Sequence, residues 1–472
     1  MATRLNPPER PGSGPPRRGG RFLSLFNLRP GEVAPVLLAG AMFFCILCGY
    51  FFIRPVRDAF GVERGMSTLY SLFVATMAAS LALSPVFSWL VGRFDRRVFL
   101  PIAYGSIVLM LIGFATWRAM AGDGAASVWS GRIFFVWLSV INLFMTGLFW
   151  SLMADCFDAA DSRRVFPTIA VGGTVGALLG SASAWAVSGY PFELFGKALF
   201  DLKFQLTAPQ MMMVSACFVA LAGGASVAMS RVRQGRGSGT AERPRRSAIR
   251  EAMDGMRLAV SSRYLLFIAF YIALLAVLAT FLYFTQNALV LAAQSSESGR
   301  VGAFASIDFW TQFATLVVQL FVSARLMRWL GVGWTLAILP ALVLVGYVVL
   351  AAGELNAWSA ATMLGVITVI QAVFRAGKYA IIRPARETLF TVLSRDEKYK
   401  AKSLIDTFVY RAGDTAGAGV SAALSAVAVG TMIALSLTVA PIAIVMAGLA
   451  LSLGVERSRR ATGTTSSSSQ AG

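Results

Sequence analysis

Two stretches of this sequence are nearly the same: GYFFIRPVRDAF, Gly49 to Phe60, and KYAIIRPARETLF, Lys378 to Phe390. Both follow the pattern Y-x-x-I-R-P-x-R-[D/E], and their tyrosines, Tyr50 and Tyr379, stand 329 positions apart (379 − 50). A charged side chain beside or inside an apolar span costs free energy, and it usually faces the interior of a helical bundle. The repeated stretch, here called the Arg-Pro cassette, therefore predicts equivalent positions in a pseudo-symmetric membrane protein.

The composition supports a membrane protein. Of the 472 residues, 57% are hydrophobic and only 14% are charged, with a mean hydropathy of +0.68. Soluble domains carry about 25% charged residues. The apolar runs are long and unbroken, which favours transmembrane helices over the short alternating strands of a barrel.

Twelve apolar segments are long enough to cross a bilayer, which requires about 20 helical residues. Several are longer, so we expect tilted helices or helices that extend beyond the membrane. The segments lie near 33–60, 67–91, 98–120, 130–157, 165–188, 208–230, 264–293, 301–324, 332–352, 357–390, 403–428 and 430–454.

The net charge of +19 is unevenly distributed. Basic loops all fall on one side of the predicted spans, at 92–97, 161–164, 324–329, 394–402 and 456–460, together with the N-terminal arm and the linker. The positive-inside rule then places both termini in the cytoplasm. We expect a multi-pass protein of the cell (inner) membrane, bacterial in origin. The orientation of the spans in the membrane accounts for the excess of Lys and Arg, so we expect no nucleic-acid binding.

A flexible basic linker divides the spans six plus six. Two such halves are the layout of major facilitator transporters. We therefore expect an all-α membrane protein with twelve transmembrane helices in two pseudo-symmetric six-helix bundles. The expected parts are a disordered basic cytoplasmic arm (1–32), an N-terminal six-helix bundle (33–230), a basic cytoplasmic linker (231–263), a C-terminal six-helix bundle (264–454) and a disordered tail (455–472).

The loop at 191–206 has apolar residues on one helical face and charged residues on another. This spacing predicts a short helix lying on the outer membrane surface.

Two glycine-rich stretches, VGGTVGALLGS at 171–181 and RAGDTAGAGVS at 411–421, occupy equivalent places in the two halves. They lack the lysine of a phosphate-binding loop, so we interpret them as small-residue helix packing.

The chain contains no histidine and four cysteines. Cys45 and Cys48 form a CxxC inside an apolar span, without a second pair. We expect no metal, no cofactor and no enzyme activity; a membrane enzyme acting on lipid or isoprenoid substrates is the disfavoured alternative.

If three-span units repeat, spans one, four, seven and ten line a central cavity. Each cassette proline can kink its span and free carbonyl groups there. Cations outnumber acids near these positions, which favours an anionic ligand, because guanidinium groups match phosphate and carboxylate. The candidate substrate-binding residues are Arg57, Arg386, Arg54, Arg383, Arg375, Lys378, Tyr50, Tyr379, Trp150, Gln286 and Asn287; the candidates for gating or coupling are Asp58, Glu387 and Asp155, with Asp308 as a further acid in the set.

A structural interpretation of the cassettes stays open. Asp58 and Glu387 could simply neutralise neighbouring arginines, or both cassettes could lie at the membrane surface, where long side chains reach water cheaply.

The cassettes, with GLFWSLMADCF at 147–157 and above all the long stretch at 378–414, resemble the nucleotide transporter family of ATP/ADP antiporters of obligate intracellular bacteria and plastids, and its free-living bacterial relatives within the major facilitator fold. The resemblance spans most of residues 30–454.

This resemblance implies an essential basic residue on spans one and ten, at Arg57 and Arg386, where the nucleotide exchangers carry lysine. It also implies glutamates on spans four and seven, but the matching positions are Leu138 and Tyr283. The cationic half of the family's site is kept, and the acidic half is not.

We therefore expect a monomeric secondary transporter, embedded in the lipid bilayer, that moves a small anionic solute, nucleotide or phosphorylated, by alternating access. The alternative is a major facilitator-type transporter of another organic anion, such as a carboxylate or sugar phosphate, with proton coupling through one of the acidic candidates.

Overall fold

The computed structural model describes residues 32–94, 96–122, 124–157, 159–194, 197–200, 204–234, 262–393, 397, 401–402, 405–426 and 432–469. Apart from one short hairpin and the connections, these residues are helical. The elements are α2 (Val33–Val62), α3 (Met66–Arg93), α4 (Arg96–Met120), α5 (Ala125–Cys156), α6 (Ala159–Ala186), β1 (Phe192–Leu194), β2 (Lys197–Phe200), α7 (Ala208–Gln234), α9 (Arg263–Ala293), α10 (Glu297–Phe321), α11 (Ser323–Leu355), α12 (Ala360–Ala376), η1 (Gly377–Ile382), α13 (Arg383–Leu389), η2 (Phe390–Val392), η3 (Ile405–Val409), α15 (Tyr410–Ala426) and α16 (Met432–Ser469).

Eleven helical segments in the described part of the chain are long and apolar enough to cross a membrane. They coincide with eleven of the twelve predicted spans. The remaining predicted span, 403–428, is occupied by η3 and the 17-residue helix α15. Helices are expected because a lipid-exposed backbone must satisfy its hydrogen bonds within its own segment.

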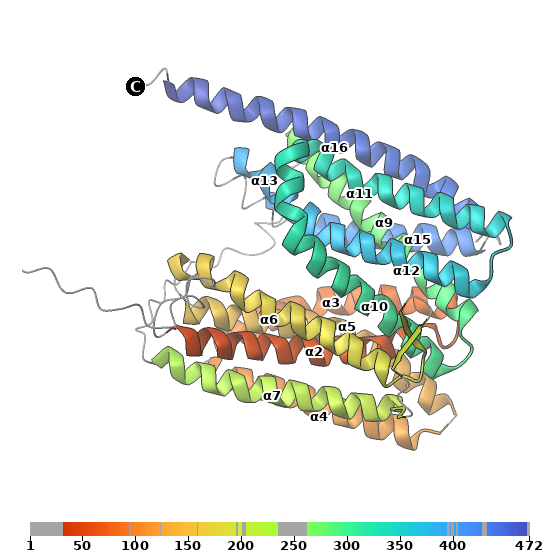
Figure 1. The fold of residues 1–472 in the computed structure, drawn as a ribbon. Helices are drawn as coiled ribbons and strands as arrows, with labels where there is room; N and C mark the ends of the chain where they lie inside the picture. The colour runs from red at the N-terminus through yellow and green to blue at the C-terminus, as the bar shows by residue number, and fades with distance from the viewer. Residues whose placement is uncertain are drawn as a thin grey trace, which may run out of the picture.

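The helices form two bundles, α2 to α7 and α9 to α16 (Figure 1). Within the bundles, α2 packs against α6 as α9 packs against α15, and α4 packs against α7 as α11 packs against α16. Between them, α6 packs against α10 as α15 packs against α3. In each comparison, the second pair of helices lies six spans after the first along the chain, so the contacts repeat between the two halves of six spans.

Glycines bring the paired helices into backbone contact. A Cβ added at Gly176 of α6 would lie 2.4 Å from the carbonyl oxygen of Phe44 in α2, and one added at Gly413 of α15 would lie 2.5 Å from that of Ala273 in α9. Small residues permit such close approach. The interpretation of both glycine-rich stretches as helix packing is confirmed.

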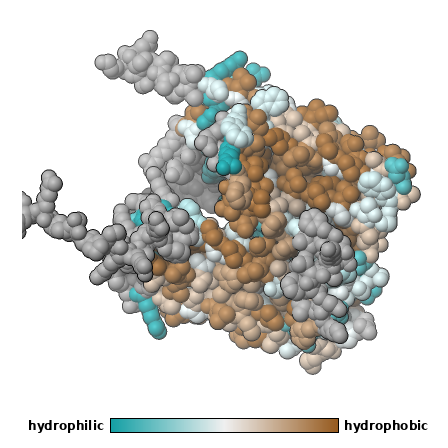
Figure 2. All heavy atoms as spheres, in the orientation of Figure 1, coloured by the Kyte–Doolittle hydropathy of each residue, from teal (hydrophilic) through white to brown (hydrophobic). Residues whose placement is uncertain are grey.

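Hydrophobic side chains cover much of the face visible in Figure 2, while hydrophilic residues gather toward its two ends. Leu109 in α4 is 71% exposed and Leu437 in α16 is 72% exposed. Such exposed leucines suit a lipid environment, and with the eleven long apolar helices they identify a multi-pass membrane protein.

The predicted surface helix at 191–206 is wrong. Its described part contains an antiparallel hairpin in which Phe192 pairs with Phe200 and Leu194 with Lys197. The helical spacing of apolar residues extends over too short a segment to decide between a helix and strands.

The end of the last span and the effect of the cassette prolines also differ from what the sequence predicted. Helix α16 continues to Ser469, beyond residue 455, where a tail was expected; Glu456 and Arg460 pair one turn apart along it, at 3.1 Å. Helix α2 runs without interruption through Pro55, whereas span ten changes to the π-helix η1 just before Arg383 and Pro384. The two cassettes, alike in sequence, therefore have different backbones.

Candidate functional site

Five charged side chains meet between the two bundles, and we call them the central charge cluster. They are Arg54, Arg57 and Asp58 of α2, Asp308 of α10 and Arg375 of α12. Arg54 donates from Nη1 to Oδ1 of Asp308 at 2.7 Å, and Arg375 donates from Nη1 to the same oxygen at 2.8 Å. One carboxylate thus holds two guanidinium groups from different halves of the chain.

Arg57 and Asp58 form the second part of the cluster. Nη2 of Arg57 donates to Oδ1 of Asp58 at 2.5 Å, and Nη1 donates to Ser139 of α5 at 3.2 Å. The hydroxyl of Tyr283 in α9 donates to the same Asp58 oxygen at 3.2 Å. The guanidinium also lies 5.2 Å from the centre of the Phe135 ring, a cation–π contact.

The cluster is buried and carries excess positive charge. Arg57 is 8% exposed, and Asp58 and Asp308 are 1% and 2% exposed. With all five groups ionised, three cations face two anions, leaving one positive charge. Buried charge is stable only when it is paired and hydrogen-bonded. The arrangement therefore suits a further anion.

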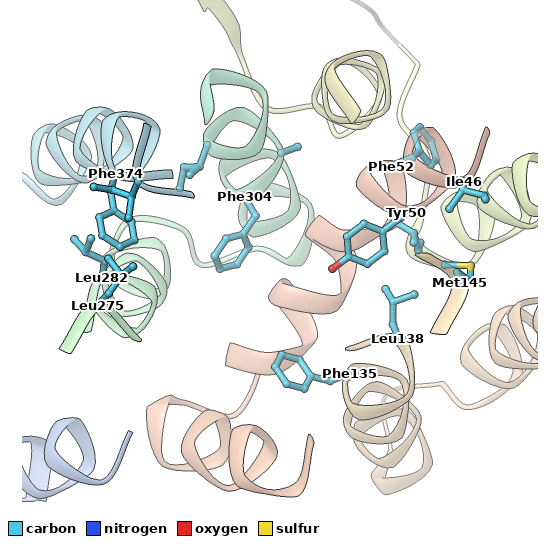
Figure 3. Close-up of a cluster of buried hydrophobic side chains, with 14 of the residues drawn as sticks. Ile46, Tyr50, Phe52, Phe135, Leu138, Met145, Leu275, Leu282, Phe304 and Phe374 are labelled. Atoms are coloured by element: carbon cyan, nitrogen blue, oxygen red, sulfur yellow. The ribbon is translucent and has the colours of Figure 1, made fainter. Parts of the chain in front are cut away.

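All four spans expected to line the centre reach this cluster. Arg57 belongs to span one, Ser139 to span four, Tyr283 to span seven and Arg375 to span ten. Figure 3 shows apolar side chains of both halves around this region, with the Tyr50 hydroxyl directed between them. Span eight adds Asp308, which the sequence marked only as a further acid.

The cluster lies away from the end of the molecule at which α2 and α9 begin and α7 and α16 end (left in Figure 1). We call this the basic end, because the basic N-terminal arm and linker of the sequence adjoin these helix ends. Arg57 lies five residues before α2 ends at Val62 (62 − 57), and Asp308 lies eleven residues after α10 begins at Glu297 (308 − 297). At 1.5 Å per residue, Arg57 is about 8 Å from the end of α2 and Asp308 is about 17 Å from the start of α10, and both of these helix ends lie opposite the basic end.

Further contacts join the halves toward that opposite end. Arg118 of α4 lies 2.7 Å from the carboxylate of Glu297 in α10. Tyr70 of α3 donates to the carbonyl of Ser421 in α15 at 3.2 Å, and the rings of Trp185 and Phe309 are 5.6 Å apart. The two bundles are thus joined by ionic, polar and aromatic contacts from the cluster outward.

The second cassette lies near the basic end. Nη2 of Arg386 is 3.8 Å from Glu387, and Lys402 donates to Glu387 at 2.6 Å. Arg383 is exposed, and the Glu387 side chain is 39% exposed. The first cassette is therefore buried among charges of both bundles, whereas the second is partly exposed.

Lys378 and Tyr379 lie on the same span as Arg375 and Arg383. Lys378 donates to the Tyr410 hydroxyl at 2.6 Å and lies 5.1 Å from its ring centre. Tyr379 is 53% exposed although it lies in mid-span. These residues form a basic and aromatic line along span ten, between the central charge cluster and the basic end.

The remaining candidates are packed in different ways. Trp150 contacts the rings of Phe43 and Phe166, so its described contacts are aromatic packing. Gln286 and Asn287 are buried, and their side-chain oxygens have no hydrogen-bond donor among the described residues. Asp155 is half-buried, one residue before α5 ends at Cys156.

The two positions that lack the family's glutamates have contrasting surroundings. Leu138 is buried among apolar side chains (Figure 3). Tyr283 instead donates a hydrogen bond to Asp58. Sequence reasoning missed the contacts of Ser139, Arg118 and Glu297, which no motif marks.

A cavity of about 1090 Å³ lies to one side, between the region of Trp185 and Tyr190 and the helices α10 and α12. Among the described residues that line it, none is charged. Because this lining offers no positive charge to an anion, the central charge cluster carries the candidate site.

A family model described as the TLC ATP/ADP transporter matches residues 116–454, which is 339 of the 472 residues (454 − 116 + 1). The chain belongs to this family. The TLC assignment identifies a secondary membrane transporter and not an enzyme. A search of curated protein sequences finds no match.

Solved structures similar to this TLC-family chain are transporters of the major facilitator fold. A point mutant of the nucleoside transporter NupG matches with a TM-score of 0.61 and 12% identity, covering 89% of this chain and 99% of its own. A POT family transporter in complex with 5-aminolevulinic acid gives 0.61 and 11%, covering 89% and 96%. A bacterial homologue of the human lysosomal transporter Spinster gives 0.55 and 14%, covering 92% and 98%. At these identities the likeness shows the fold.

Proposed function

We propose that this protein moves an anionic solute of the nucleotide or phosphorylated class across the cell membrane by alternating access. The observation that carries the proposal is the buried excess of positive charge between the two bundles, where Arg54, Arg57 and Arg375 face only Asp58 and Asp308. Guanidinium groups bind phosphate and carboxylate oxygens through paired, charge-assisted hydrogen bonds.

The line of residues on span ten supports a path to this site. Arg383 and Arg386 near the basic end and Lys378 and Tyr379 farther in would attract an anion and guide it toward Arg375. With the basic end in the cytoplasm, as the positive-inside rule requires, this path leads in from the cytoplasm. Both termini would then be cytoplasmic.

The contacts at the opposite end support alternating access. In this arrangement, the bundles are joined from the central charge cluster to Arg118 and Glu297. Transport requires these contacts to break while others form at the basic end, as one bundle rocks against the other around a central site.

A transporter of another organic anion is the second candidate. The observation that favours it is the pair of non-acidic residues, Leu138 and Tyr283, at the positions where the family carries glutamate. Such a site would keep the attraction for anions and lose part of the recognition of a nucleotide.

Counterflow in proteoliposomes tests the proposal. Vesicles loaded with ATP, ADP, phosphate or a dicarboxylate would be assayed for uptake of labelled ATP. We expect uptake that requires internal nucleotide and that falls at least about tenfold in Arg57→Ala and Arg386→Ala, because each change removes a charge–anion interaction. Arg64→Gln is the matched control: it removes an exposed arginine near the same end of α2 and should leave uptake unchanged.

Two outcomes would contradict the proposal. Folded protein that takes up no labelled ATP, whichever of the four solutes is inside, would contradict nucleotide transport and favour the second candidate. Equal uptake in Arg57→Ala and in Arg64→Gln would show that the central charge cluster does not hold the anion.

A further inference from the structure

Asp308 is placed where an anionic substrate would be expected. Its Oδ1 accepts from Arg54 of the first bundle and from Arg375 of the second, at 2.7 and 2.8 Å. Its Oδ2 is buried and has no hydrogen-bond donor among the described residues. A phosphate or carboxylate oxygen of a substrate would make the same two contacts, because the chemistry of the acceptor is the same.

Asp308 differs from the other buried acid of the cluster. The charged partners of Asp58 among the described residues, Arg57 and Arg54, lie on its own helix α2, so these charges move together when the bundles move; its contact with the other bundle is the hydrogen bond from the uncharged Tyr283. The contact between Arg54 and Asp308 crosses from α2 to α10, and movement of one bundle against the other breaks it. Breaking it would leave Asp308 with Arg375 alone and Arg54 with only its 3.7 Å pair to Asp58, and a buried charge that loses a partner is unfavourable.

A second ion pair between the bundles is less protected. Arg118 and Glu297 also join them, but the Glu297 side chain is 36% exposed, whereas that of Asp308 is 3% exposed. Water can replace the partner of an exposed charge at little cost. The bond from Arg54 to Asp308 is therefore the larger obstacle to opening this end in the absence of substrate.

We propose that Asp308 acts as an internal anion that locks the substrate-free transporter and thereby makes exchange obligatory. This rests on the proposed function, since it takes Arg54 and Arg375 as part of the anion site. A bound substrate anion supplies Arg54 with the acceptor oxygen that it loses when Asp308 moves away with the second bundle. Only the loaded protein then passes readily between its two states, because a ligand shifts such an equilibrium through its different affinity for each state.

The test compares two rates of efflux from proteoliposomes loaded with labelled ATP. One is efflux into buffer without substrate, and the other is efflux into buffer with unlabelled ATP. We expect the wild-type protein to be faster with external ATP by about tenfold or more, the size of a typical coupling between a ligand and a conformational change. Asp308→Asn should release ATP into substrate-free buffer nearly as fast as into ATP. Asparagine keeps the size of the side chain but cannot balance two guanidinium groups.

Two controls accompany this variant. Glu297→Gln removes the exposed pair between the bundles and should keep the wild-type ratio of the two rates. Asp308→Glu keeps the charge and should also keep a high ratio, which separates loss of the carboxylate from a change in packing.

A second measurement does not depend on the folding of Asp308→Asn. Spin labels at Ala126 of α5 and Ser298 of α10, in a protein without its native cysteines, report the distance between the bundles at the end opposite the basic end. Without nucleotide, the short distance should dominate, and saturating ATP should populate a longer one. Equal populations with and without ATP would overturn the lock.

The efflux outcomes separate the two proposals. Wild-type protein that exchanges ATP, together with an Asp308→Asn variant of unchanged ratio, overturns the lock and leaves the proposed function standing. Wild-type protein that releases ATP equally fast into both buffers overturns the lock and obligatory exchange, and it leaves the proposed function standing. Wild-type protein that moves no ATP in either direction overturns the proposed nucleotide transport and the lock with it.

Discussion

Arg57 and Asp58 show how one buried pair can hold a site in shape. The carboxylate of Asp58 accepts from Arg57 and from Tyr283, so it connects span one to span seven. Ser139 holds the other side of the same guanidinium. Because both charges are almost completely buried, neither can be compensated by water, and each depends on the other.

Removing one of these charges should destabilise the protein. Asp58→Asn should lower the free energy of unfolding in detergent by about 3–5 kcal/mol, because it leaves the Arg57 guanidinium buried without its anion. Glu387→Gln is the control; its side chain is 39% exposed, and its loss should cost about 0–1 kcal/mol. Denaturant titrations of both variants measure this difference. Equal losses would mean that Arg57 is hydrated in the detergent-solubilised protein.

At the scale of elements, helix contacts repeat where small residues repeat. Gly172, Gly176 and Gly180 of α6 follow one another at intervals of four, and an added Cβ at each would lie 2.4 Å from a carbonyl oxygen of α2. Because α2 carries Arg54, Arg57 and Asp58, this contact also sets the position of the central charge cluster. The packing and the site are therefore linked through one helix.

Widening this contact should therefore reduce stability. Gly176→Ala should lower the free energy of unfolding by about 1–3 kcal/mol, as other overpacking changes do. Gly113→Ala in α4 is the matched control, since nothing lies within 4 Å of its added Cβ. Alanine favours a helix over glycine by about 1 kcal/mol, so this variant should be neutral or more stable. Thermal unfolding of the two variants distinguishes the cases, and loss of stability in both would contradict close packing as the cause.

At the scale of the whole molecule, the two bundles meet through a few helices. The contacts between them come mainly from α10 with α6 and α2, with smaller contributions from α3 with α15 and α9 and from α2 with α9. The ion pairs and rings described at this junction belong to residues inside the bundles. The division into two halves can therefore be tested by cutting the chain between them.

Fragments 1–245 and 246–472, produced together, should co-purify and recover counterflow, because the contacts between the bundles do not require a continuous linker. As a control, the chain cut between residues 357 and 358 should recover much less, because neither fragment then contains a complete second bundle: α11 packs on α12 and on α16 across that cut. Pull-down of one tagged fragment and transport assays measure both. Equal recovery from the two cuts would contradict the proposed boundary.

Much of the fold could be predicted from the order of the residues. Span positions depend on local hydropathy, which a linear sequence displays directly, and eleven of twelve predicted spans coincide with long apolar helices. The glycine-rich stretches also indicated their role, because a repeat of small residues has the same meaning in any transmembrane helix. The predicted surface helix failed because a short segment has too few residues for its periodicity to be decisive.

The membrane class, the two-fold repeat of the halves, the family and the excess of cations near the centre all follow from the order of the residues. Which buried groups meet depends on how the chain folds: Arg54 pairs with Asp308, 254 positions away, and Tyr283 donates to Asp58, 225 positions away. The tertiary structure also decided how deep the two cassettes lie, with Arg386 near the basic end and Arg57 buried between the bundles. The physical reason is that crossing a membrane depends on neighbours in the chain, whereas pairing a buried charge depends on neighbours in space.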